Sequence, residues 1–213
     1  VLRSTEGNRF RLADQDGNLY LAELVIKDKA GFAKILEKID EDNEMKVKVT
    51  IIQALIKGER WDYFLQKATE CGVTRIVPFV GERNVVKYDP TTDVKKLDRW
   101  RKIVQEAAEQ SLRNIVPEVA APIAMKDLEN YLSDANYVAY ELEAKTSHEL
   151  KTMDMKQDSL SVLIGSEGGF SPREIERFQA IGFVPVGLGK RILRAETAAI
   201  VALTLIESKS ETH

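Results

Sequence analysis

The chain has 213 residues, of which 44% are hydrophobic and 31% charged, and its formal net charge is -3. These values are typical of an ordinary globular protein with one large or two small domains. The slight negative charge argues against a protein that coats nucleic acid by charge alone. Because the chain has only His148 and His213, a histidine-based triad or a zinc site has little material, and we expect no metal.

The compartment is indicated by what the sequence lacks. The single cysteine, Cys71, cannot form an internal disulfide and fits a reducing environment. No apolar run approaches the length of a membrane span, and the first residues do not resemble a signal peptide. We therefore expect a cytoplasmic protein with no membrane partner.

The first part of the chain is predicted to be a small unit rich in strands. Apolar and polar residues alternate in two segments between residues 9 and 24, with the tight-turn pair Asp16 and Gly17 between them. This pattern predicts a β-hairpin. The acidic run IDEDNEM that follows marks a solvated loop, so we expect one domain over residues 1–46 and a second over 47–213.

The second domain is predicted to alternate between strands and helices. Apolar runs of strand length occur at 47–56, 73–80, 137–141, 162–164 and 184–188. Helical patterns cover residues 94–112, 125–132 and 195–206, and two more begin near Trp61 and after Ser171. This alternation favours an α/β fold with a parallel sheet and helices on both of its faces.

Two loops of this domain carry glycine and follow strands. The first runs through Gly165, Gly168 and Gly169 and leads into a helix with Ser at its cap, Pro at its first position and Glu at its third. The second covers residues 190–194 and follows the strand at 184–188, which ends at Gly187 and Gly189. Open α/β sheets bind ligands outside the carboxyl ends of their strands, so these loops indicate a ligand site.

Four polar residues next to these apolar runs have two interpretations. In one, Glu196 and Thr197 cap the last helix and Arg194 pairs with Glu167. In the other, the four residues belong to a ligand site. The sequence pattern alone leaves both open.

The segments IGSEGGFSPREI and LGKRILRAETAAI resemble the signature of the SPOUT methyltransferases. They are most similar to the ribosomal RNA small subunit methyltransferase E family, which methylates N3 of a uridine in 16S rRNA with S-adenosylmethionine. Ser166 stands where that family often has proline. The resemblance implies a C-terminal trefoil knot formed by residues 165–206. It also implies an N-terminal PUA-like barrel that binds RNA and whose first part precedes Val1.

The resemblance also implies which residues contact the ligands. The implied cofactor contacts are Leu163, Ile164, Gly165, Glu167, Gly168, Leu188, Gly189, Ile192, Leu193, Arg194 and Thr197. The implied RNA contacts are Arg3, Arg9, Arg83, Gln110 and Arg113. For Arg3 and Arg9 taken singly, an exposed side chain without a ligand is at least as good an interpretation, and for Arg83 it is the better one.

The implied reaction requires that the uridine N3 lose its proton, since the protonated imide has no useful lone pair. We expect Arg194 to stabilise the negative charge, because its guanidinium is always charged and presents a rigid fork of donors. Glu196 or Glu167 would orient Arg194 or accept the proton, and the sequence does not rank them. The last helix, apolar on every side, indicates a homodimer. The alternatives are a SPOUT methyltransferase with another RNA target, such as a tRNA ribose, and an RNA-binding adaptor without catalysis.

Overall fold

The computed structural model describes residues 5–86, 88–89, 93–141, 149–153 and 155–211. They form two compact units. The N-terminal unit consists of the residues up to Glu44 together with Leu112–Ile115, and the second unit consists of Met45–Ser111 and the residues from Val116 onward. Val1 and Arg3 lie outside the described residues.

The N-terminal unit contains an antiparallel sheet of three strands. These are β1 (Arg9–Ala13), β2 (Leu19–Lys27) and β3 (Ala30–Ile39), in the order β1-β2-β3. The predicted hairpin is therefore confirmed, and its turn uses Gly17 at a φ of 80°, which a residue without a side chain adopts readily. Only Leu19 and Ala22 of this sheet are fully buried, so the unit has a very small apolar core.

The segment Leu112–Ile115 joins this unit through side chains. The Asn114 Nδ2 group donates hydrogen bonds to the carbonyl oxygens of Gly17 at 3.0 Å and Glu41 at 2.9 Å. Arg113 forms an ion pair with Glu44. The expected division at residues 46 and 47 differs from this arrangement, because these contacts join residues about 70 to 97 positions apart.

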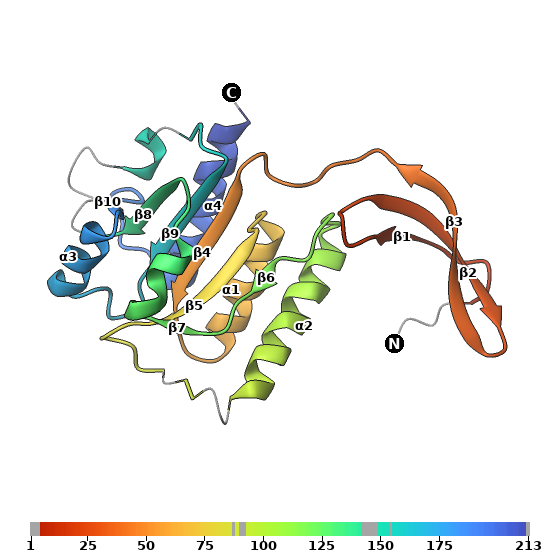
Figure 1. The fold of residues 1–213 in the computed structure, drawn as a ribbon, viewed down its shortest axis with the longest axis horizontal. Helices are drawn as coiled ribbons and strands as arrows, with labels where there is room; N and C mark the ends of the chain where they lie inside the picture. The colour runs from red at the N-terminus through yellow and green to blue at the C-terminus, as the bar shows by residue number, and fades with distance from the viewer. Residues whose placement is uncertain (1–4, 87, 90–92, 142–148, 154, 212–213) are drawn as a thin grey trace. The chain divides into compact units, whose positions relative to one another are not determined.

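The second unit is built on a parallel sheet, as predicted. Its strands are β4 (Lys48–Ala54), β5 (Arg75–Val80), β6 (Glu118–Val119), β7 (Ile123–Ala124), β8 (Ala135–Ala139), β9 (Ser159–Ile164) and β10 (Val184–Val186). Their order is β10-β8-β9-β4-β5-β6, with β7 also paired to β5 (Figure 1). Every described pair in this sheet is parallel. The late strand β9 thus lies between β8 and β4.

Helices cover both faces of this sheet. They are α1 (Glu59–Glu70), α2 (Val94–Gln110), α3 (Pro172–Ala180) and α4 (Ala195–Ser210), with 3-10 turns η1 (Met125–Tyr131) and η3 (Leu150–Thr152). One core cluster joins β4 and β9 to α1, α2 and α4, and the other joins the alternate residues of the same strands to η1 and α3. The predicted arrangement of helices on both faces is confirmed.

No described helix has both the length and the apolar character needed to cross a membrane.

Candidate functional site

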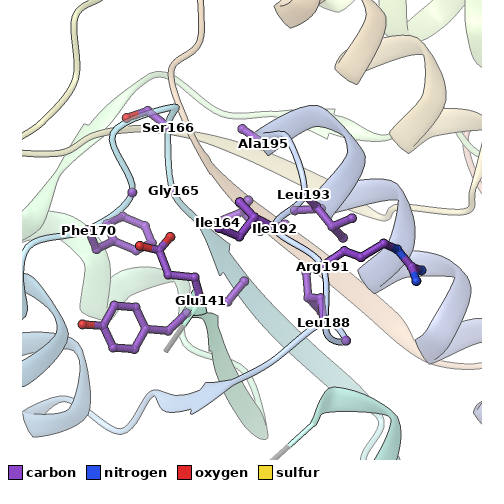
Figure 2. Close-up of a pocket in the computed structure, with 15 residues that line it drawn as sticks. Glu141, Ile164, Gly165, Ser166, Phe170, Leu188, Arg191, Ile192, Leu193 and Ala195 are labelled. Carbon is purple, nitrogen blue, oxygen red and sulfur yellow. The ribbon is translucent and has the colours of Figure 1, made fainter. Parts of the chain in front are cut away.

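A pocket opens at the carboxyl ends of β8, β9 and β10, within the second unit (Figure 2). Its wall is formed by the end of β8, the glycine loop after β9, the loop after β10 and the first turn of α4. The lining residues are Ala139, Tyr140, Glu141, Ile164, Gly165, Ser166, Gly169, Phe170, Leu188, Gly189, Arg191, Ile192, Leu193, Ala195 and Ala198. The two glycine-bearing loops predicted from the sequence therefore meet at one site.

The loop after β9 folds back on itself within five residues. The Gly169 amide donates to the Ser166 carbonyl at 2.9 Å, which closes a turn, and Gly169 has a φ of 61°. A Cβ atom added to Gly165 would lie 3.2 Å from the Gly169 Cα. A side chain at position 165 would press on this backbone, because the two ends of the turn approach closely.

A capping box fixes the start of α3. The Ser171 hydroxyl accepts from the Glu174 amide at 3.1 Å, and the Glu174 carboxylate accepts from the Ser171 amide at 2.8 Å. This confirms the cap predicted from the sequence. The Glu174 carboxylate also accepts from the Glu82 amide at 2.9 Å, so the chain after β5 is tied to the same helix start.

Two arginines hold the glycine loop from outside the pocket. Arg83 donates from Nη1 to the Gly168 carbonyl at 3.1 Å. Arg60, on α1, forms an ion pair with Glu167 at 2.5 Å. The interpretation in which Arg194 pairs with Glu167 is therefore wrong, since Arg60 occupies that position. Neither Glu167 nor Gly168 lines the pocket.

The second wall comes from the loop after β10. Gly189 has a φ of 104°, and a Cβ atom added to it would meet nothing within 4 Å, so the chain turns there with open space beside it. Arg194 is the N-cap residue of α4, and this helix begins without a side-chain cap hydrogen bond. The interpretation in which Glu196 and Thr197 cap the helix is therefore wrong.

The polar residues at the start of α4 differ in burial. The side chains of Arg194 and Thr197 are exposed, and none of Arg194, Glu196 and Thr197 lines the pocket. Glu196 is 6% exposed, and its Oε2 atom accepts no hydrogen bond from any described residue. A buried carboxylate oxygen without a partner is costly, which makes Glu196 the unusual residue of this turn.

Six of the predicted cofactor residues line the pocket. They are Ile164, Gly165, Leu188, Gly189, Ile192 and Leu193. Leu163 does not, because its fully buried side chain joins the core cluster with η1 and α3, whereas Ile164 joins the cluster on the opposite face.

Sequence reasoning missed three conspicuous lining residues, Glu141, Phe170 and Arg191. Glu141 carries the only carboxylate among the described lining residues, and Figure 2 shows it directed into the pocket. The available signal was that Glu141 stands at the end of the strand predicted at 137–141. This signal points to the pocket because β8 lies next to β9 in the sheet.

The predicted RNA contacts occupy different settings. Arg9 is exposed on β1, Gln110 is exposed at the end of α2, and Arg83 binds the glycine loop. The prediction that Arg113 contacts RNA is wrong. Its side chain is only 3% exposed and its guanidinium is engaged by Glu44, which leaves it inaccessible to a phosphate. Arg3 lies outside the described residues.

Ser166 lines the pocket, yet its Oγ atom is buried without a hydrogen bond to any described residue. Because an unpaired buried hydroxyl is unfavourable, we expect Ser166→Ala to stabilise the protein by about 1 kcal/mol. This corresponds to a rise in Tm of about 2 to 4 °C, measurable by calorimetry.

A matched serine in the same loop should respond in the opposite direction. Ser171→Ala removes the cap of α3 and should destabilise the protein by about 1 kcal/mol. Equal destabilisation by both substitutions would contradict the assignment of Ser166 as an unsatisfied group.

Among the described residues, no group of three or more histidine, cysteine, aspartate and glutamate side chains is placed to hold a metal ion.

Comparison with known proteins places this architecture in a family. Residues 43–207 match the profile of the RNA methyltransferase domain. The chain is 38% identical over 221 residues to ribosomal RNA small subunit methyltransferase E of Bacillus subtilis (strain 168), covering 99% of this chain and 86% of the relative.

Two solved structures are also similar. Ribosomal RNA small subunit methyltransferase E of Neisseria gonorrhoeae, bound to S-adenosyl methionine, aligns with a TM-score of 0.87 and 33% identity over 97% of this chain and 85% of that one. A methyltransferase of Legionella pneumophila with bound SAM aligns with the same TM-score and 32% identity, and with the same coverage of both chains. The chain therefore belongs to the ribosomal RNA small subunit methyltransferase E family of RNA methyltransferases.

Proposed function

We propose that this chain transfers a methyl group from S-adenosylmethionine to N3 of a uridine in 16S ribosomal RNA. The observation that carries the proposal is the meeting of two glycine-bearing loops, 165–170 and 188–193, across one pocket. Relatives with this fold are named as small subunit rRNA methyltransferases, and two neighbours hold S-adenosylmethionine. The position of the pocket, outside the carboxyl ends of parallel strands, is where α/β sheets bind such ligands.

The residues of the pocket fit the chemistry of this cofactor. Ile164, Phe170, Leu188 and Ile192 offer apolar surface for a purine ring. Glycines beside them leave backbone groups accessible for hydrogen bonds. Glu141 faces into the pocket, where a carboxylate suits hydroxyl and cationic groups (Figure 2). When bound, S-adenosylmethionine supplies a methyl group on a positively charged sulfur. This sulfur is a good leaving group, because it departs as a neutral thioether when the methyl group is transferred.

Arg194 is the residue that we assign to binding the uridine that accepts the methyl group. It lies between Leu193 and Ala195, which both line the pocket, and its exposed side chain makes no ion pair among the described residues. Its guanidinium is thus available to hold the oxygen of a uridine on which negative charge develops.

Glu196 is the carboxylate that we assign to proton transfer. Glu167 is already engaged by Arg60, whereas Glu196 keeps a buried oxygen without a partner among the described residues. A base must have a free lone pair within reach of the proton that it removes. Of Glu167 and Glu196, only Glu196 meets the requirement for a free lone pair.

The SPOUT knot and the PUA-like domain are part of the proposal. Residues 165–206 would form the trefoil knot, supported by the contact of both loops with one pocket. The three-stranded N-terminal sheet would belong to a PUA-like barrel that binds RNA, supported by exposed Arg9 on β1.

We include a homodimer in the proposal. Ile200, Val201 and Leu205 of α4 are only half-buried within one chain, and Ile192 at the pocket is 86% exposed. Apolar side chains that a single chain leaves partly or fully exposed suit a subunit interface. Sedimentation equilibrium should give twice the chain mass, and a monomer at micromolar concentration would contradict this part.

The function is tested by binding and by product. We expect isothermal titration calorimetry to show one S-adenosylmethionine site per chain, and mass spectrometry of treated 16S rRNA to show one methyl on uridine N3. The absence of S-adenosylmethionine binding would indicate an RNA-binding adaptor without catalysis. Methylation of a tRNA ribose instead of rRNA would indicate a SPOUT enzyme with another target. Either result would overturn the proposal.

A further inference from the structure

Gln53 is a buried polar residue outside the pocket that the function described above does not use. It lies near the end of β4, is 0% exposed and does not line the pocket. A carboxamide in a fully buried strand position is unfavourable unless its donors and acceptors are used. Its hydrogen bonds therefore indicate why it is there.

The side chain of Gln53 acts where the ladder between two strands stops. The last pair in the register of β4 with β9 is Gln53 with Ile164. Just beyond it, the Gln53 Nε2 group donates to the Ala54 carbonyl at 3.0 Å and to the Gly165 carbonyl at 3.2 Å. One amide group thus links the two strands at the point where their regular pairing ends.

The chemistry of the two partners determines the orientation of the amide. Both are carbonyl oxygens, which only accept hydrogen bonds, and the NH2 group has two protons to donate. The Oε1 atom therefore faces the other way, and it accepts no hydrogen bond from any described residue. A carboxylate or an apolar side chain of the same length cannot make this bridge.

The bridge reaches the loop at a sensitive position. Gly165 lines the pocket, and an added Cβ atom would come within 3.2 Å of the Gly169 Cα, so the two ends of the turn leave little room for adjustment. Figure 2 shows Gly165, Ser166 and Phe170 on this folded loop. A rotation of the Gly165 peptide would therefore displace the loop that forms one wall of the pocket.

We propose that Gln53 is a positioning residue, which sets the orientation of the Gly165 peptide and thereby the shape of the loop at 165–170. This inference rests on the proposed function in one respect, namely that the loop at 165–170 holds S-adenosylmethionine. Gln53 itself does not line the pocket.

Two variants of nearly equal size test this role. Gln53→Glu keeps the shape but replaces the donor group by an acceptor, and Gln53→Met keeps the length without either. We expect both to lower kcat/KM for S-adenosylmethionine by about tenfold to 100-fold, as expected for a misplaced binding group, with the KM for rRNA unchanged. Values within twofold of the wild type would overturn the inference.

A control on the same strand separates positioning from general stability. Thr50 is 8% exposed and lies on β4, three residues before Gln53 and away from the pocket. Thr50→Val should leave the Kd for S-adenosylmethionine unchanged. If Thr50→Val weakened binding as strongly as Gln53→Met, a nonspecific effect of the strand would explain both, and the inference would be wrong.

A readout without ligand keeps this test independent of the proposed function. Hydrogen exchange of the amides at 165–170 should be faster in both Gln53 variants than in the wild type, and unchanged in Thr50→Val. If the wild type binds no S-adenosylmethionine, the proposed function fails while the exchange rates still decide the role of Gln53. If the variants do not fold, NMR of the wild type provides the test instead. The Nε2 protons of Gln53 should then exchange slowly with solvent, and rapid exchange would refute the bridge.

Discussion

Arg194→Ala is expected to lower kcat for methyl transfer by about 100-fold or more while leaving the fold intact. A preorganised donor that stabilises developing negative charge contributes an effect of this order. The fold should survive because the Arg194 side chain is exposed and forms no ion pair among the described residues. The measurement is transfer of labelled methyl to 16S rRNA, with circular dichroism of the same preparations.

Two further substitutions sharpen the interpretation. Arg194→Lys keeps the charge but loses the planar fork, so it should recover only part of the activity. Arg173→Ala removes another exposed arginine, located on α3 and absent from the pocket wall, and should leave activity unchanged. An Arg194→Ala enzyme with activity within twofold of the wild type would exclude Arg194 from catalysis.

The second large effect concerns the ion pair between Glu44 and Arg113 in the N-terminal unit. The Glu44 Oε1 atom accepts from Arg113 Nε and from the Asn114 amide, both at 2.9 Å, and Oε2 accepts from Arg113 Nη2. The side chains are 15% and 3% exposed, respectively. Because Glu44→Ala removes a carboxylate that accepts hydrogen bonds from a buried guanidinium, it should destabilise this unit by about 3 to 5 kcal/mol.

Hydrogen exchange read by mass spectrometry can assign this loss to one unit. Peptides from β1 to β3 should lose protection in Glu44→Ala, whereas peptides from β4 and β9 should keep theirs. The matched control is Glu41→Ala, which breaks the exposed pair of Arg11 and Glu41 in the same unit and should cost less than about 1 kcal/mol. Equal losses in the two variants would show that burial does not set the strength of these pairs.

Local features of the fold could be predicted from the sequence. The hairpin turn at Gly17 and the cap of α3 at Ser171 depend on residues within a few positions of one another, and both are confirmed. The place of Leu112–Ile115 could not be predicted, because it depends on the contacts of Asn114 and Arg113 with residues in the first 44 positions. Sequence periodicity carries no information on such distant pairs.

The candidate site was predictable for the backbone more than for the side chains. Glycine after a strand indicates a loop at the carboxyl edge of the sheet, and Gly165 and Gly189 both line the pocket. The partner of a charged residue depends on which side chains lie near it in three dimensions. The pairing of Glu167 with Arg60 instead of Arg194 therefore could not be predicted from the sequence. The roles assigned to Arg194 and Glu196 stay predictions.

The position of β9 has a consequence for how fast this protein reaches its native state. Lys48 pairs with Ser159, more than 100 residues later, so the centre of the sheet cannot form until a long stretch of chain has been drawn together. The entropy cost of closing so long a loop comes before the stabilising contacts can form. Folding rates therefore fall as the sequence separation of paired residues increases. We therefore expect slow refolding of the second unit, with the pairing of β4 and β9 forming late.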